Sequence, residues 1–258
     1  MPVVKFFGKV VPSNHYQTSL MNMPSLHFHA GDGGLEVDLT ITVKNSELEV
    51  NCSMATYTNS SFQLLHKIAY DFARASINLV VFSTGLSFSV FFDKMIDENE
   101  QPSAFIIHHP ALGNLCTAFS ITQPQPNPAL NESINIIMSE PALFLALDDL
   151  VTSASHHHLL IVNAARAIEG LRHAMTPTGN SREHEWEKFR NNLNMDRKYV
   201  SLITDHSKHG RHGDNTFIPG NITEQISTRS WTIFNRFIEF RRNNNVALNI
   251  SAYPMLVG

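Results

Sequence analysis

The sequence has little of what marks disulfide-rich or membrane proteins. Only 2 of its 258 residues are Cys, and two isolated Cys without a Cys-x-x-Cys pair make neither a disulfide framework nor a zinc site. No run approaches the roughly 18 apolar residues that a membrane span needs. The first residues also lack the apolar core of a signal peptide. We therefore expect a cytoplasmic protein with no membrane partner, and we expect Cys52 and Cys116 to be buried thiols.

Charge is also sparse, at 16% of residues, and the formal net charge of -4 provides no global attraction for nucleic acid. The distribution along the chain is uneven, however. Residues 188–242 contain 10 Lys or Arg and 5 Asp or Glu. This imbalance allows a basic face in the last third of the chain, although an ordinary solvated helix surface would have the same composition.

Several catalytic signatures are missing. The chain has no Gly-x-Ser-x-Gly elbow and no His-Glu-x-x-His zinc motif. The Gly-rich stretch 31–34 lacks the Lys-Ser/Thr pair of a phosphate-binding loop and precedes a strand pattern, so it predicts a turn. Serine hydrolases, zinc peptidases and P-loop enzymes are thereby disfavoured.

The first half of the chain has the pattern of a β-rich domain with one helix. Residues 35–43 and 48–52 alternate apolar and polar side chains on either side of a turn at 44–46, which predicts an antiparallel hairpin. Ser60 and Ser61 precede apolar residues at helical spacing. The fold class is therefore α+β, and residues 1–125 are expected to form a mostly antiparallel β domain with one helix.

Three Pro at alternate positions, 124, 126 and 128, favour an extended linker, which we place at 126–134. After it, helical patterns dominate, with Ser139-Glu140-Pro141 as a helix start. We expect a helical bundle over 135–245 and a C-terminal tail over 246–258.

The densest polar cluster is the ten-residue stretch 205–214, Asp-His-Ser-Lys-His-Gly-Arg-His-Gly-Asp. It follows a long helical pattern, and Gly210 and Gly213 predict that this helix ends near His209. An Arg offers a fork of donors suited to phosphate, and a neighbouring His exchanges protons near neutral pH. Metal-independent RNA cleavage needs this pair of functions.

With these features the C-terminal half resembles a HEPN domain, a helical bundle with a polar Arg-x(4–6)-His motif at the end of a late helix. The long helix from about 181, the His212-Gly213 pair and the closing amphipathic helix carry the resemblance, as does the polar Arg166-Ala167-Ile168-Glu169 on an earlier helix. It covers about 140–245. It implies a HEPN-like bundle, a homodimer with a shared site, and metal-independent endoribonuclease activity without a cofactor.

The motif departs from the family pattern, because the positions five to seven before His212 are Ser, His and Asp rather than Arg. Arg211 is adjacent to His212, and Lys208 lies four positions before it. We predict binding of RNA or a nucleotide, with degenerate ribonuclease activity in stress response or defence. The expected catalytic residues are His212 and Arg211, and the expected ligand-binding residues are Lys208, His209, His206 and Asp214.

Other interpretations of the same residues stay open. His206, His209 and His212 are spaced by three, as in a metal site, and Ser207 lies between polar neighbours, as a nucleophile might. Alternatively, the cluster is a structural loop in a non-enzymatic interaction and assembly module, with an internal Arg166–Glu169 ion pair. The aromatic residues Trp186, Phe189 and Trp231 are expected in the bundle core rather than as base-stacking platforms.

Overall fold

The computed structural model describes residues 2–12, 25–29, 34–104, 128–156, 159–176, 181–211 and 218–258. The chain divides into two compact units, residues 1–106 and 107–258, and each has its own hydrophobic core. Cys52 is fully buried in the first core, as expected, and burial raises the pKa of its thiol to about 12. Cys116 lies outside the described residues.

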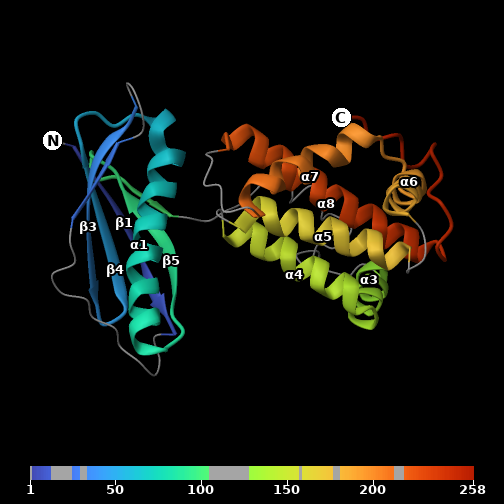
Figure 1. Ribbon diagram of the computed structural model, residues 1–258, viewed down its shortest axis with the longest axis horizontal. Coiled ribbons are helices and arrows are strands. Elements are labelled where there is room, and N and C mark those ends of the chain that lie inside the picture. Colours follow the sequence, from blue (N-terminus) through green and yellow to red (C-terminus); the bar gives the residue numbers. More distant parts are fainter. Residues whose placement is uncertain are drawn as a thin grey trace. The chain divides into compact units, whose positions relative to one another are not determined.

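The N-terminal unit is an antiparallel sheet of strand order β2-β3-β4-β1-β5-β6 with one helix on it (Figure 1). The expected hairpin is confirmed, with Asn45 and Ser46 at φ 52° and 66° in its two-residue turn. The short strand β2 alternates apolar and polar side chains over only four residues, Leu-His-Phe-His, and was not predicted. The elements are β1 (Val3–Val11), β2 (Leu26–His29), β3 (Glu36–Lys44), β4 (Glu47–Met54), α1 (Phe62–Thr84), β5 (Ser89–Ile96) and β6 (Pro102–Ala104).

Helix α1 covers one face of this sheet. Buried and exposed residues alternate strictly along β3, so one face of the strand is apolar and the other polar. The apolar face packs against the buried side chains of α1, among them Leu65 and Ile68. The α+β fold class and the single helix on an antiparallel sheet are confirmed.

The C-terminal unit consists of helices packed around α5 (Figure 1). Pro141 occupies the first turn of α4 as predicted, and the apolar stripe Ile168, Leu171 and Met175 of α5 is buried. Helix α3 begins at Pro128, inside the segment expected as a linker. The helices are α3 (Pro128–Ser139), α4 (Pro141–Ser155), α5 (Leu160–Met175), α6 (Arg182–Asn192), α7 (Arg197–Arg211) and α8 (Gly220–Arg242).

The segment 246–258, expected as a tail, is bound to the helices. Asn194, in the left-handed conformation between α6 and α7, donates from its amide to the carbonyls of Leu248 and Tyr253 at 2.9 and 3.0 Å. The buried Arg236 of α8 donates to the carbonyls of Leu193 (2.7 Å) and Pro254 (2.7 Å). These bonds satisfy buried carbonyl groups, so the segment closes the turn between α6 and α7.

None of the described helices is long and apolar enough to cross a membrane.

Candidate functional site: a basic groove between α6 and α7

The cluster 205–214 begins on α7 rather than in a loop. The helix was expected to end near His209, and α7 is described to Arg211, two residues further along. Local contacts support its last turns: the hydroxyl of the buried Ser207 donates to the Thr204 carbonyl at 2.8 Å, and Lys208 pairs with Asp205 across one turn at 2.8 Å. These bonds stabilise the helix up to the glycine that was expected to end it.

Two of the six predicted site residues have described side chains. His206 Nδ1 lies 2.9 Å from the Leu202 carbonyl oxygen, so this nitrogen carries the proton. Lys208 is exposed beside Asp205. The side chains of His209 and Arg211 are outside the described set, as are the whole residues His212 and Asp214. The described parts of the chain contain no group of three or more His, Cys, Asp or Glu arranged to hold a metal ion.

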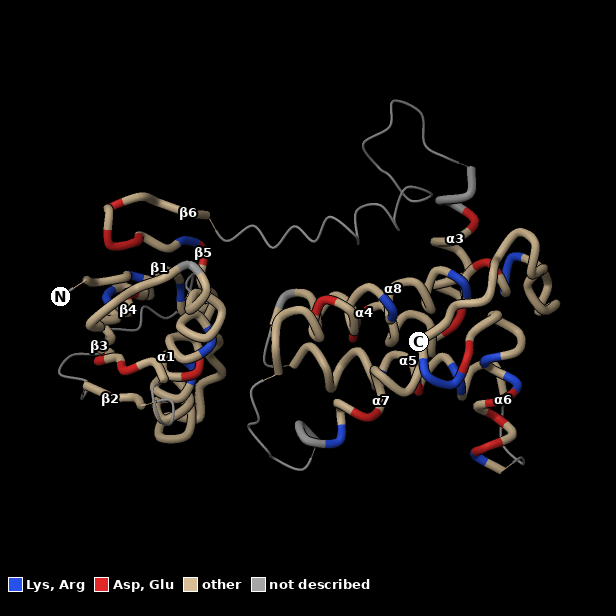
Figure 2. The backbone as a smooth tube through the Cα atoms, turned by 90° about the horizontal axis from the view of Figure 1, so that it is seen from above, with Lys and Arg blue, Asp and Glu red and all other residues tan. Residues whose placement is uncertain are grey.

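A basic groove of about 580 Å³ lies between α6 and α7. Its α6 wall carries Arg182, Trp186 and Arg190, four residues apart and therefore on one helical face. Its α7 wall begins with the exposed Arg197 and Lys198. Basic and acidic residues both lie along α6, and basic residues stand at the beginning of α7 (Figure 2). The remaining lining residues are Glu183, Val200, Ser201, Thr204 and Asp205.

The cations of this groove are largely unneutralised. Among the side chains that the structure describes, no carboxylate pairs with Arg190, Arg197 or Lys198. Arg182 reaches Glu169 of α5 at 3.5 Å, outside the groove lining, and Asp205 is paired with Lys208. The groove therefore presents an excess of positive charge to solvent, as an anion site requires.

The turn that joins the two groove walls is firmly held. Asp196 accepts a hydrogen bond from the Tyr199 backbone N–H at 2.6 Å, which caps α7. This bond, with weaker ones from the Gly258 and Lys198 backbone and the positive charge of Lys198, lowers the pKa of the Asp196 carboxyl. From α8, Arg229 donates to the Tyr199 carbonyl at 3.2 Å, and its guanidinium lies 4.7 Å from the centre of the Tyr199 ring. The Asp196 cap and the Arg229 contacts thus fix the first turn of α7, on which Arg197 and Lys198 lie.

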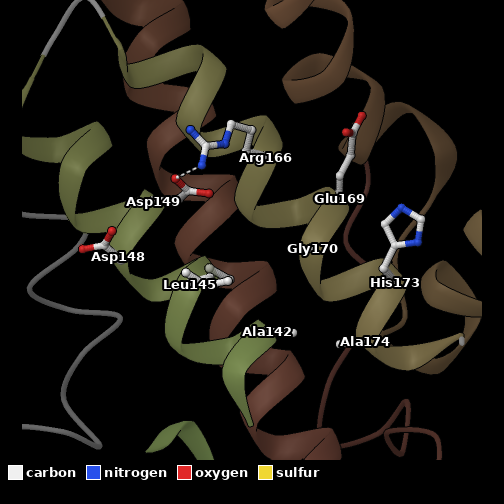
Figure 3. A pocket seen from close by; sticks show the side chains of 10 residues that line it. Ala142, Leu145, Asp148, Asp149, Arg166, Glu169, Gly170, His173 and Ala174 are labelled. Carbon is white, nitrogen blue, oxygen red and sulfur yellow. Dashed lines mark ion pairs between the residues drawn. The ribbon is translucent and has the colours of Figure 1, made fainter.

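A second groove of about 580 Å³ lies between α4 and α5, and Asp148, Asp149, Arg166 and Glu169 are the charged residues of its lining (Figure 3). Arg166 lies 3.2 Å from Asp149, as the dashed line in Figure 3 marks. Burial raises the pKa of the Asp149 carboxyl, with Arg166 opposing the shift and Asp148 adding to it. The expected Arg166–Glu169 ion pair was wrong, because the carboxylate of Glu169 pairs with Arg182 instead. We call these the basic groove and the acidic groove.

Sequence reasoning identified the basic bias of 188–242 but none of the cations that line the basic groove. The i, i+4, i+8 spacing of Arg182, Trp186 and Arg190 was a usable signal for one wall. The other wall depends on the angle between two helices joined by a short turn, which spacing does not reveal. Phe189 is core, as expected, whereas Trp186 is only half-buried and lines the groove.

The fold and the groove define a two-domain α+β protein with a candidate anion site in its helical unit. Comparison with protein families agrees with this division. Residues 4–105 match the model described as the DUF8168 N-terminal domain, and residues 130–242 match the DUF8168 C-terminal domain, both domains of unknown function. The chain therefore belongs to the two-domain DUF8168 family. No curated protein and no solved structure matches it.

Proposed function

We propose that this protein binds RNA or a nucleotide through the basic groove. The observation that carries the proposal is the set of three cations, Arg190, Arg197 and Lys198, which line one groove and form no ion pair with a carboxylate among the described residues. Arg and Lys without carboxylate partners keep their full charge for phosphate, and Arg adds a planar fork of donors. The net charge of -4 limits this attraction to one part of the surface.

The groove and residues 205–211 of the cluster lie on the same helix. Asp205 lines the groove and is also the first residue of the cluster. From Arg197 to Arg211, α7 rises roughly 21 Å at about 1.5 Å per residue. A strand held in the groove and following α7 would therefore reach the cluster. This arrangement supports the HEPN-like interpretation, in which His212 acts as the base and Arg211 as the phosphate donor of a metal-independent ribonuclease.

Binding is tested with a short fluorescein-labelled oligouridylate at about 0.1 M salt. The double variant Arg197→Ala/Lys198→Ala should bind at least about tenfold more weakly. Its slope of log affinity against log salt should fall by about 0.7 for each lost phosphate contact. Lys9→Ala/Lys44→Ala removes the same charge from exposed positions of the sheet and should bind like the wild type. Equal losses in both double variants would contradict a local site.

Cleavage is tested on a mixed RNA pool with EDTA present. If the cluster is catalytic, the wild type cleaves and His212→Ala does not, while both retain RNA with similar affinity. If neither protein cleaves but both bind, the protein is a binding module and the ribonuclease part of the proposal is wrong.

A second candidate function is protein assembly, including the homodimer that the HEPN resemblance implies. Helices α3 and α4 expose large apolar side chains, among them Met138 at 66% and Leu145 at 60%. The contacts of His206 and Lys208 within their own helix also suit a structural role. Light scattering after gel filtration tests this candidate: a dimer should become a monomer in Met138→Ser/Leu145→Ser. A cytoplasmic location remains part of the same proposal.

A further inference from the structure

Trp186 is the aromatic member of the basic groove. It lies on α6 one turn from Arg182 and one turn from Arg190, and all three line the groove. Since Trp186 is half-buried, the surface that it leaves exposed belongs to the groove wall. An indole beside phosphate-binding cations is the combination on which single-stranded nucleic acid binds, because each unpaired base offers a flat face.

A buried charged residue fixes the orientation of this indole. The Arg172 guanidinium of α5 lies 4.9 Å from the centre of the Trp186 ring. Arg172 is 3% exposed, forms an ion pair with Glu185, and donates to His173 Nε2 at 2.8 Å. The ring of Phe189 meets the indole edge-on at a centroid distance of 5.9 Å. A buried ion pair adds little stability compared with apolar packing, so its effect here is to define where the guanidinium and the ring lie.

The shape of the groove decides between paired and unpaired nucleic acid. In a duplex the base faces are stacked inside the helix and cannot contact a side chain on a protein wall. The groove is concave and about 580 Å³ in volume, and Trp186 is part of its lining. Only a base outside a duplex can enter and lie against the indole.

We infer that the basic groove binds an unpaired nucleotide, with its base stacked on Trp186 and its phosphates on Arg190, Arg197 and Lys198. The inference rests on the proposed RNA or nucleotide binding and specifies its substrate class as single-stranded. Arg172 is a positioning residue, because it contacts Trp186 and does not line the groove.

The test uses the fluorescence of Trp186 itself. The chain has two Trp, so Trp231→Phe leaves Trp186 as the only indole. Titration with oligouridylate should change its emission and reach saturation, and a blunt duplex RNA of the same length should bind at least about tenfold more weakly. Trp186→Ala should lose at least about fivefold in affinity for the oligouridylate, the lower end of the effect of removing a stacking aromatic. Trp186→Phe should retain most of the affinity, which controls for misfolding.

Arg172→Met tests the positioning role in the same background. Binding should weaken while the salt slope stays at the wild-type value, because no phosphate contact is lost. If oligouridylate binds with the salt slope expected from Arg197 and Lys198, but Trp186 emission is unchanged or duplex binds equally well, the inference is wrong and the proposed function stands. If neither RNA binds, the proposed function is itself wrong, and the inference fails with it.

Discussion

The basic groove and the acidic groove are of equal size, about 580 Å³ each, yet they differ in what their charges do. In the acidic groove Asp149 and Arg166 neutralise one another at 3.2 Å. In the basic groove Arg197 and Lys198 form no ion pair with a carboxylate among the described residues. The two grooves therefore cannot be told apart by volume, and the pairing of their charged groups is what makes the basic groove the candidate anion site.

The two grooves are also physically connected through α5. Glu169 lines the acidic groove and pairs with Arg182, which lines the basic groove, at 3.5 Å. Arg172 contacts the Trp186 ring, and the next residue of α5, His173, lines the acidic groove. A change of charge in one groove should therefore be felt in the other, and the following predictions use this link and the separate supports of each groove.

The largest expected effect on stability concerns the turn between α6 and α7, which joins the two walls of the basic groove. Arg236→Met should lower the free energy of unfolding of the helical unit by about 2–4 kcal/mol, because three carbonyls, two of them in buried contacts, lose a charged donor. Those carbonyls belong to Leu193, Asn194 and Pro254. Urea titration followed by Trp fluorescence reports only the helical unit, since both Trp lie in it. Arg229→Met, on the same helix but with longer bonds at 3.2 and 3.4 Å, should cost less; equal losses would contradict the assignment.

The next largest effect on stability is expected from loss of the Asp196 cap of α7. Asp196→Ala should destabilise the helical unit by roughly 1 kcal/mol at neutral pH, as the loss of an N-cap usually does. Hydrogen bonding to the Tyr199 N–H lowers the pKa of Asp196. The stabilisation should therefore be complete above the unfolded value of about 3.9 and disappear as the pH falls through the lowered folded pKa. The test compares wild type and variant between pH 7 and 2; a difference that grows on acidification would refute the cap.

These two predictions show what the sequence could and could not provide. Alternation and turn residues were sufficient for the β3–β4 hairpin, and Pro141 was sufficient for the start of α4. Gly210 and Gly213 were sufficient to place the end of α7 within two residues of Arg211, its last described residue. The hydrogen bonds at the turn between α6 and α7 join Asn194 to Leu248 and Tyr253, 54 and 59 residues away. Such long-range pairs leave no local pattern, so the spacing of residues could indicate the α6 wall of the basic groove but not how α7 is placed against it.

A smaller effect of opposite sign is expected in the acidic groove. A methyl group added at Gly170 would meet no atom within 4 Å. Gly170→Ala should therefore stabilise the helical unit by about 0.5–1 kcal/mol, through the higher helix propensity of Ala alone. Oligouridylate affinity should be unchanged, because the groove that binds it lies elsewhere. Urea titration measures the stability and fluorescence anisotropy measures the affinity. A weakened affinity would indicate that the oligouridylate binds in the acidic groove, contrary to the proposal.

The smallest effect tests the link between the grooves. Glu169→Gln frees Arg182 from its ion pair and should raise oligouridylate affinity about two- to threefold, the scale of an exposed ion pair. Asp149→Asn removes the same charge from the acidic groove but leaves the Glu169–Arg182 pair intact, so the affinity should stay at the wild-type value. Equal gains in both variants would indicate a general effect of net charge and no specific link.

The central claim is that single-stranded RNA lies in the basic groove, against Trp186. Photo-crosslinking of a 4-thiouridine oligonucleotide to the full chain, followed by mass spectrometry of the peptides, locates the bound base directly. We predict crosslinks concentrated on α6 and the first turns of α7, at Trp186 above all. Crosslinks confined to the β sheet or to the acidic groove would contradict the account.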